Sequence, residues 1–202
     1  MIINIFNRKL NLAISYFVLL VWIAFLFNSI AHGFESKAKT VLVIDDLTNT
    51  ILLEKNSSER IPPASMSKLM TLYMVFEALK DKRILMTDII RVSKNASQKG
   101  GSKMFLNEGQ DVSIEDIIRG IIIHSGNDAC IAIAETLSGT ENAFAKDMNA
   151  KAKRLGLTNS SFTNSTGWPD QNHYMSAIDL ANLASRIRVE FPNYYKFFAE
   201  DS

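Results

Sequence analysis

The sequence has a single cysteine, only three histidines and almost no net charge. Cys130 has no partner for an internal disulfide, and its apolar neighbours predict a small buried core residue. The histidines, His32, His124 and His173, show no ligand spacing, so we expect no metal site and no cofactor. The formal charge of +1 gives no electrostatic reason to expect nucleic acid as a partner.

The N-terminus has the layout of a secretory signal peptide. Arg8 and Lys9 precede a predominantly apolar run over residues 12–27, and small residues follow that run. We therefore expect a signal peptide over residues 1–33. Because the run is only somewhat shorter than the ~20 residues of a membrane span, an uncleaved anchor is the alternative. Both interpretations place residues 34–202 outside the cytoplasm.

With 47% hydrophobic residues, the remainder of the 202-residue chain has enough apolar material for one globular domain. Apolar runs at residues 40–44 and 51–54 surround a turn-rich segment and predict a β-hairpin. Residues 89–92 predict a further short strand. The expected helices are residues 65–79, a helix capped by Ser113, residues 128–137, a helix between Thr140 and Gly156, and one from Ser176 to about Pro192.

Two loops and one apolar stripe complete this outline. Loops are expected over residues 97–102 and 158–174. Met66, Met70 and Met74 are expected to widen the buried face of the first helix.

A two-stranded hairpin is only marginally stable alone, so further strands are expected to follow this chain. We therefore expect an α+β fold that is incomplete, with an N-terminal hairpin, a helical part and missing C-terminal sheet strands.

Ser65 and Lys68 lie three residues apart at the predicted start of a helix, where both side chains face the same side. A serine hydroxyl needs a base to become a good nucleophile, and lysine serves as that base only when it is neutral. Burial and the positive end of a helix both favour the neutral amine. The alternative is an ordinary serine at a helix start beside a solvated lysine. A second Ser-x-x-Lys match, at residues 36–39, lies in a polar linker and is treated as chance.

Ser125, Gly126 and Asn127 interrupt two apolar helices, and polar groups at such a break can point into a cleft. Ser125 is a candidate proton relay between Lys68 and a leaving amine. The Asn127 amide is a candidate to hold a substrate carbonyl or to fix Lys68. The alternative makes Ser125 or Asn127 an N-cap of the next helix. Another Ser-x-Asn match, at residues 93–95, follows a short strand and is the poorer candidate.

In these motifs and their flanks, the chain resembles the D-alanyl-D-alanine carboxypeptidases, which are low-molecular-mass penicillin-binding proteins and S11-like serine peptidases related to the serine β-lactamases. The resemblance covers about residues 40–198. The stretches that carry it are residues 62–71, 104–106, 123–130 and 155–159.

The resemblance implies a DD-peptidase (transpeptidase-like) fold and a serine enzyme that removes the terminal D-alanine of peptidoglycan stem pentapeptides. Ser65 would form the acyl-enzyme, Lys68 would act as general base, Ser125 would relay the proton and Asn127 would bind substrate. β-Lactams would act as inhibitors by acylating Ser65. The chain would lie in the periplasm or at the outer face of the inner membrane.

The sequence also departs from the family pattern, because it contains no Lys-Thr-Gly. In the family this motif binds the substrate carboxylate, and its strand supplies an oxyanion-hole amide. The nearest approach, Ser165-Thr166-Gly167, lies in a polar loop. We therefore expect residues 34–202 to be a truncated catalytic domain with impaired activity.

Three alternatives to an active carboxypeptidase remain. One is a catalytically inactive relative, or a remnant, that still binds cell-wall material. A second is a β-lactamase, which the sequence disfavours because its second motif is Ser-Gly-Asn and it has no Glu-x-x-Leu-Asn stretch. The third is an unrelated membrane-anchored helical protein with accidental motifs, which the agreement of motif order, spacing and flanks disfavours.

Overall fold

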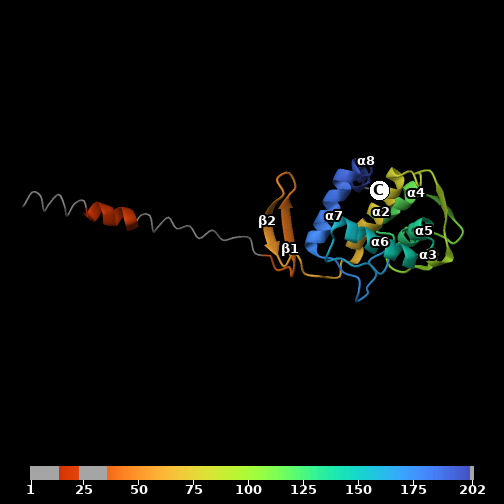
Figure 1. The fold of residues 1–202 in the computed structure, drawn as a ribbon, viewed down its shortest axis with the longest axis horizontal. Coiled ribbons are helices and arrows are strands. Elements are labelled where there is room, and N and C mark those ends of the chain that lie inside the picture. Colours follow the sequence, from red (N-terminus) through yellow and green to blue (C-terminus); the bar gives the residue numbers. More distant parts are fainter. Residues whose placement is uncertain (1–13, 23–35, 201–202) are drawn as a thin grey trace, which may run out of the picture. The chain divides into compact units, whose positions relative to one another are not determined.

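The computed structural model describes residues 14–22 and 36–200, which belong to two units: residues 1–37 and residues 38–202 (Figure 1). In the first unit, residues 14–22 form a helix whose side chains are exposed. No helix within the described ranges is both long enough and apolar enough to cross a membrane. The basic residues and the expected cleavage site of the predicted signal peptide lie outside the described residues.

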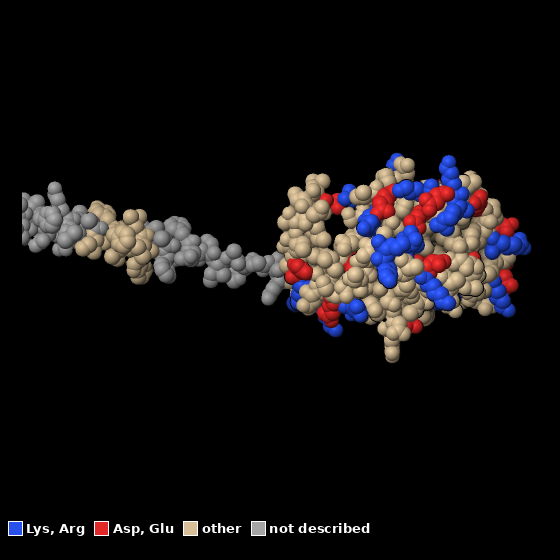
Figure 2. Space-filling view, viewed as in Figure 1, with Lys and Arg blue, Asp and Glu red and all other residues tan. Residues whose placement is uncertain are grey.

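The second unit is a helical body with two short hairpins. Its elements are β1 (Val41–Asp45), β2 (Thr50–Lys55), η1 (Ala64–Ser67), α2 (Lys68–Lys80), β3 (Ile89–Arg91), α3 (Lys94–Gln98), β4 (Asp111–Ser113), α4 (Ile114–Ile123), α5 (Asn127–Ser138), α6 (Glu141–Leu155), α7 (Ala177–Glu190), α8 (Pro192–Tyr195) and η2 (Lys196–Ala199). Lys, Arg, Asp and Glu side chains are mixed over its visible face (Figure 2).

The predicted N-terminal hairpin is confirmed. β1 and β2 pair antiparallel, with an irregularity between Val43 and Ile44. The Asp45 carboxylate accepts the Thr48 backbone N–H at 2.8 Å and therefore closes the turn. Outward-facing residues of the hairpin remain exposed, including Leu52 at 64%. The hairpin packs on α7, and Arg188 of that helix forms an ion pair with Asp46.

A second hairpin pairs β3 with β4, and only β3 was expected from the sequence. β4 is three residues long and leads directly into α4, so its pattern is too short to detect. The described residues therefore form two separate two-stranded sheets beside the helices. This mixture agrees with the predicted α+β class.

α2 is the central helix of the body, and it contacts α4, α5, α6 and α7. Its buried face includes Met70 and Phe76, both with no exposed surface. Met66 was expected to join this face, but it is 49% exposed because it lies on η1, before α2 begins. Cys130 of α5 is fully buried, as its apolar neighbours predicted.

Three predicted helix starts are confirmed by their caps. Ser113, Thr140 and Ser176 each accept a backbone N–H from the residue three positions later, which satisfies a donor that the helix leaves unpaired. Gly156 ends α6 in the left-handed conformation, with φ of 77°.

Two parts of the outline need correction. The loop expected over residues 97–102 is partly helical, because α3 extends to Gln98 with Ser93 as its cap. α7 ends at Glu190, close to the predicted end near Pro192, but the α8 and η2 segments that follow it were not predicted. There Tyr194 stacks on Phe76 of α2, with ring centroids 5.3 Å apart, so this segment covers one side of the central helix.

Candidate active site

Ser65 lies on a one-turn 3-10 helix, η1, and not on the α-helix expected from residue 65. The turn begins with Ala64 in the left-handed region, with φ of 49°, which a residue other than glycine adopts at some cost. The Ser67 hydroxyl donates to the Ala64 carbonyl at 2.9 Å and holds the turn from inside. Ser65 is exposed, so its hydroxyl is accessible from solvent.

Lys68 is the first residue of α2 and is buried, with 4% of its surface exposed. Its Nζ lies 3.0 Å from the Ser65 Oγ and 3.2 Å from the Ser125 Oγ. Two hydroxyls are thus its hydrogen-bond partners within the described part of the chain, where no carboxylate forms an ion pair with it. The structure therefore brings together three side chains that lie up to 60 residues apart in the sequence.

Burial lowers the pKa of Lys68 below the ordinary lysine value, because the ammonium loses its hydration. A charge on the Cys130 thiol would oppose this effect. Burial raises the pKa of Cys130 to about 12, so the thiol is neutral at physiological pH and offers no negative charge. The position of Lys68 at the positive end of α2 also disfavours its charged form. The environment therefore favours a neutral amine next to the Ser65 hydroxyl.

Ser125 comes from the break between α4 and α5. It has a φ of 51°, so the chain turns sharply there. The N-cap of α5 is Gly126, with no side-chain cap, and this excludes the interpretation of Ser125 or Asn127 as the capping residue. The Gly126 N–H donates to the Gly120 carbonyl at 2.9 Å, which ties the break to α4.

Asn127 is buried, and its side chain faces the loop before β4. Its Nδ2 donates to the Gly100 carbonyl and its backbone N–H to the Ser102 carbonyl, both at 2.8 Å. No hydrogen bond joins Asn127 to Lys68 among the described residues, so the expectation that the amide fixes Lys68 finds no support. A Cβ at Gly101, where φ is 82°, would lie 2.7 Å from the Asn127 Nδ2, so glycine is required for this close approach.

Asp128 is a residue of the site region that the sequence analysis missed. It is fully buried, and its carboxylate accepts three backbone N–H groups, from Met104, Leu106 and Ala129, each at 3.0 Å. It therefore fastens the loop at residues 102–106 to the start of α5. An acidic residue at the start of an apolar run was the available signal.

The loop containing Ser165-Thr166-Gly167 packs behind the nucleophile turn. Thr71 of α2 donates to the Ser165 carbonyl at 2.7 Å. A Cβ at Gly167 would lie 1.9 Å from the Ala64 carbonyl oxygen, so only glycine fits against η1. As expected, the loop does not belong to a strand. It supports the turn that carries Ser65.

The described histidines are not arranged as metal ligands. The buried His173 accepts the Thr163 backbone N–H at its Nδ1, at 3.2 Å, and burial lowers its pKa. His124 is exposed at the end of α4. Within residues 14–22 and 36–200, no three His, Cys, Asp or Glu residues gather in a way that could hold a metal ion.

Comparison with known proteins identifies the family of the chain. The family model for D-alanyl-D-alanine carboxypeptidase matches residues 28–202. The chain belongs to the D-alanyl-D-alanine carboxypeptidase family. DacF of Bacillus subtilis is 44% identical over 170 residues, which are 84% of this chain and 42% of that protein. DacC of Escherichia coli is 38% identical over 169 residues, 81% of this chain and 42% of that carboxypeptidase.

Solved structures of D-alanyl-D-alanine carboxypeptidases and penicillin-binding proteins share the fold. DacD from Francisella tularensis has a TM-score of 0.81 and 38% identity, with 83% of this chain and 40% of that chain covered. Penicillin binding protein 5 from Haemophilus influenzae has a TM-score of 0.81 and 37% identity, with 84% of this chain and 50% of that chain covered. The predicted DD-peptidase fold is thus confirmed. The chain spans about two fifths of the length of the curated carboxypeptidases it matches.

Proposed function

We propose that this chain carries the nucleophile part of a D-Ala-D-Ala carboxypeptidase site and forms an acyl-enzyme on Ser65. The observation that carries the proposal is the contact of one buried amine with two hydroxyls, since the Lys68 Nζ lies 3.0 Å from the Ser65 Oγ and 3.2 Å from the Ser125 Oγ. Membership of the carboxypeptidase family supports the choice of substrate.

In the first step, the Ser65 Oγ attacks the carbonyl carbon of the penultimate D-alanine of a peptidoglycan pentapeptide. The neutral Lys68 amine takes the hydroxyl proton as the new C–O bond forms. Ser65 lies in the first turn of η1, where the Met66 N–H donates to the Pro63 carbonyl at 3.2 Å. The Ser65 backbone N–H is therefore the group of this turn proposed to stabilise the developing oxyanion.

In the second step, the C–N bond breaks and the terminal D-alanine leaves as an amine. The proton passes from the Lys68 Nζ through the Ser125 hydroxyl to that nitrogen. Water then hydrolyses the ester on Ser65, with the same groups accepting its proton. Asn127 is proposed to bind the substrate from the adjacent wall, although its Nδ2 already donates to the Gly100 carbonyl. Its amide oxygen and the second N–H of Nδ2 remain for the substrate.

β-Lactams are proposed to acylate Ser65 by the same first step, and the name of the Haemophilus influenzae penicillin binding protein supports this. The 202-residue polypeptide contains no Lys-Thr-Gly, so it lacks the family's carboxylate anchor and one oxyanion donor. Losing a single oxyanion donor typically costs about 10²–10³ in rate. We therefore propose that the polypeptide acylates slowly on its own.

The proposed location is outside the cytoplasm, in the periplasm or at the outer face of the inner membrane. It is supported by the basic residues and apolar run of the N-terminal 33 residues and by the extracytoplasmic position of peptidoglycan. The signal peptide remains a prediction, as does an association with the membrane surface.

The proposal is tested by incubating the 202-residue chain with benzylpenicillin and following the intact mass over hours. We expect a slow gain of one benzylpenicillin, mapped by peptide mass spectrometry to the peptide that contains Ser65, and no gain in Ser65→Ala. An adduct elsewhere, or equal labelling of the variant, would contradict the nucleophile assignment. Complete labelling within seconds would contradict the proposed impairment. No adduct at all would favour the inactive cell-wall binding module.

A further inference from the structure

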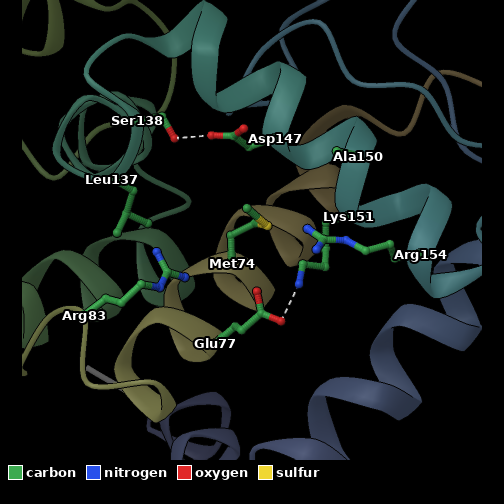
Figure 3. A pocket seen from close by; sticks show the side chains of 9 residues that line it. All are labelled: Met74, Glu77, Arg83, Leu137, Ser138, Asp147, Ala150, Lys151 and Arg154. Atoms are coloured by element: carbon green, nitrogen blue, oxygen red, sulfur yellow. Dashed lines mark hydrogen bonds and ion pairs between the residues drawn. The ribbon is translucent and has the colours of Figure 1, made fainter.

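A pocket of about 190 Å³ opens between the end of α2, the end of α5 and the middle of α6 (Figure 3). It is several times larger than the ~30 Å³ that one water molecule takes up in the liquid. Met74 and Leu137 form apolar parts of its wall. The complete lining is Met74, Glu77, Arg83, Leu137, Ser138, Asp147, Ala150, Lys151 and Arg154.

Two arginines enter this pocket from opposite sides without a partner. Arg83, from the segment after α2, and Arg154, from α6, both direct their guanidinium groups toward the cavity (Figure 3). Neither side chain forms a hydrogen bond or an ion pair within the described residues. Both are exposed, so they are hydrated and free to reorient toward a ligand.

The acidic groups of the pocket are already engaged by other side chains. Glu77 forms an ion pair with Lys151, which is buried. Asp147 accepts the hydroxyl of Ser138 at 2.6 Å. The pocket therefore has three cationic groups against two carboxylates. Lys151 balances Glu77, and the Ser138 hydroxyl brings no charge to balance Asp147, so the two unpartnered guanidinium groups leave an excess of one positive charge.

We propose that this pocket is a binding site for a phosphate-type dianion, held between the guanidinium groups of Arg83 and Arg154. A planar guanidinium donates two parallel N–H groups to an oxyanion, and two such forks match the several acceptor oxygens of a phosphate. A monocarboxylate has one negative charge and two oxygens, so it satisfies one fork and leaves the other arginine unpaired. The same chemistry is present in free phosphate and in a phosphate monoester.

The pocket is separate from the proposed acylation site. Glu77 and Lys68 lie nine residues apart on α2. At 100° and 1.5 Å per residue, this spacing puts them on opposite faces of the helix and roughly 13 Å apart along its axis. Phosphate binding and Ser65 acylation are therefore expected to be lost through different substitutions.

The test is a calorimetric titration of the 202-residue chain with inorganic phosphate at constant low ionic strength. We expect saturable binding with a dissociation constant in the low millimolar range or below. Arg83→Gln and Arg154→Gln are each expected to weaken binding by about tenfold or more. Arg91→Gln is the matched control, because Arg91 is an exposed arginine in an ion pair with Asp111 outside the pocket.

Several outcomes would overturn the proposal. They are the absence of saturable binding, equal affinity in all three variants, or acetate binding as tightly as phosphate. Phenyl phosphate in a parallel titration separates the two sources: binding as tight as that of phosphate supports a monoester ligand, and weaker binding supports free phosphate. The arginine variants are also expected to keep the wild-type rate of benzylpenicillin labelling, so a failure here is distinguishable from a failure of the Ser65 assignment.

Discussion

Replacing Lys68 with arginine is expected to slow the acylation of Ser65 by about 10²–10⁴-fold, the usual contribution of a positioned general base. Arginine keeps much of the length of lysine, but its guanidinium stays charged and does not lose a proton in a protein. The substitution therefore replaces an amine that can accept a proton with a cation that cannot. The measurement is the rate of benzylpenicillin adduct formation, followed by intact mass.

The matched control is Lys94→Arg, because Lys94 is an exposed lysine at the start of α3. It is expected to label at the wild-type rate. The pH dependence gives a second readout. The neutral fraction of Lys68 rises with pH, and because burial lowers its pKa, the wild-type rate should rise at a lower pH than an exposed lysine would allow. Wild-type kinetics in Lys68→Arg would mean that Lys68 contributes only charge.

Asp128→Ala is expected to lower the free energy of unfolding by about 3–4 kcal/mol. The substitution removes the acceptor of three backbone N–H groups, and each buried donor left without a partner costs about 1–3 kcal/mol. Water entering the new space offsets part of this cost. The measurement is urea unfolding with linear extrapolation, in which the midpoint should fall without a large change in slope.

Asp116→Ala provides the comparison for Asp128→Ala. Asp116 also lies in the first turn of a helix, α4, but it is exposed and accepts the hydroxyl of Ser113. Its loss should cost no more than about 1 kcal/mol, the usual limit for an exposed charge near a helix N-terminus. Equal destabilisation by both substitutions would show that the loop at residues 102–106 does not depend on Asp128.

The parts of the fold that were predictable from sequence depend on local chemistry. The caps of α4, α6 and α7 follow from a serine or threonine placed just before an amphipathic run. The elements that were missed, α3, β4 and α8, have three to five residues each. Such short segments contain too few periods of a hydrophobic pattern to be recognised, and tertiary contacts decide whether they form.

In the candidate site, too, local contacts could be predicted from the sequence, and contacts with distant segments could not. The spacing of Ser65 and Lys68 predicts their contact, since residues three apart meet on either an α- or a 3-10 helix. It does not predict the exposed 3-10 turn, which depends on the packing of Gly167 against Ala64. The function of Asp128 depends on a loop more than 20 residues earlier in the chain, and no local pattern reports such a contact.

The central claim is that the Lys68 amine is neutral when Ser65 attacks. It is tested most directly by an NMR titration of the chain with ¹³C-labelled lysine, in which Lys68→Arg identifies the resonance of Lys68. The account predicts that this resonance titrates at a lower pH than the signals of the exposed lysines. A Lys68 resonance that titrates together with them would contradict the account, because the amine would then remain charged and could not take the proton of Ser65.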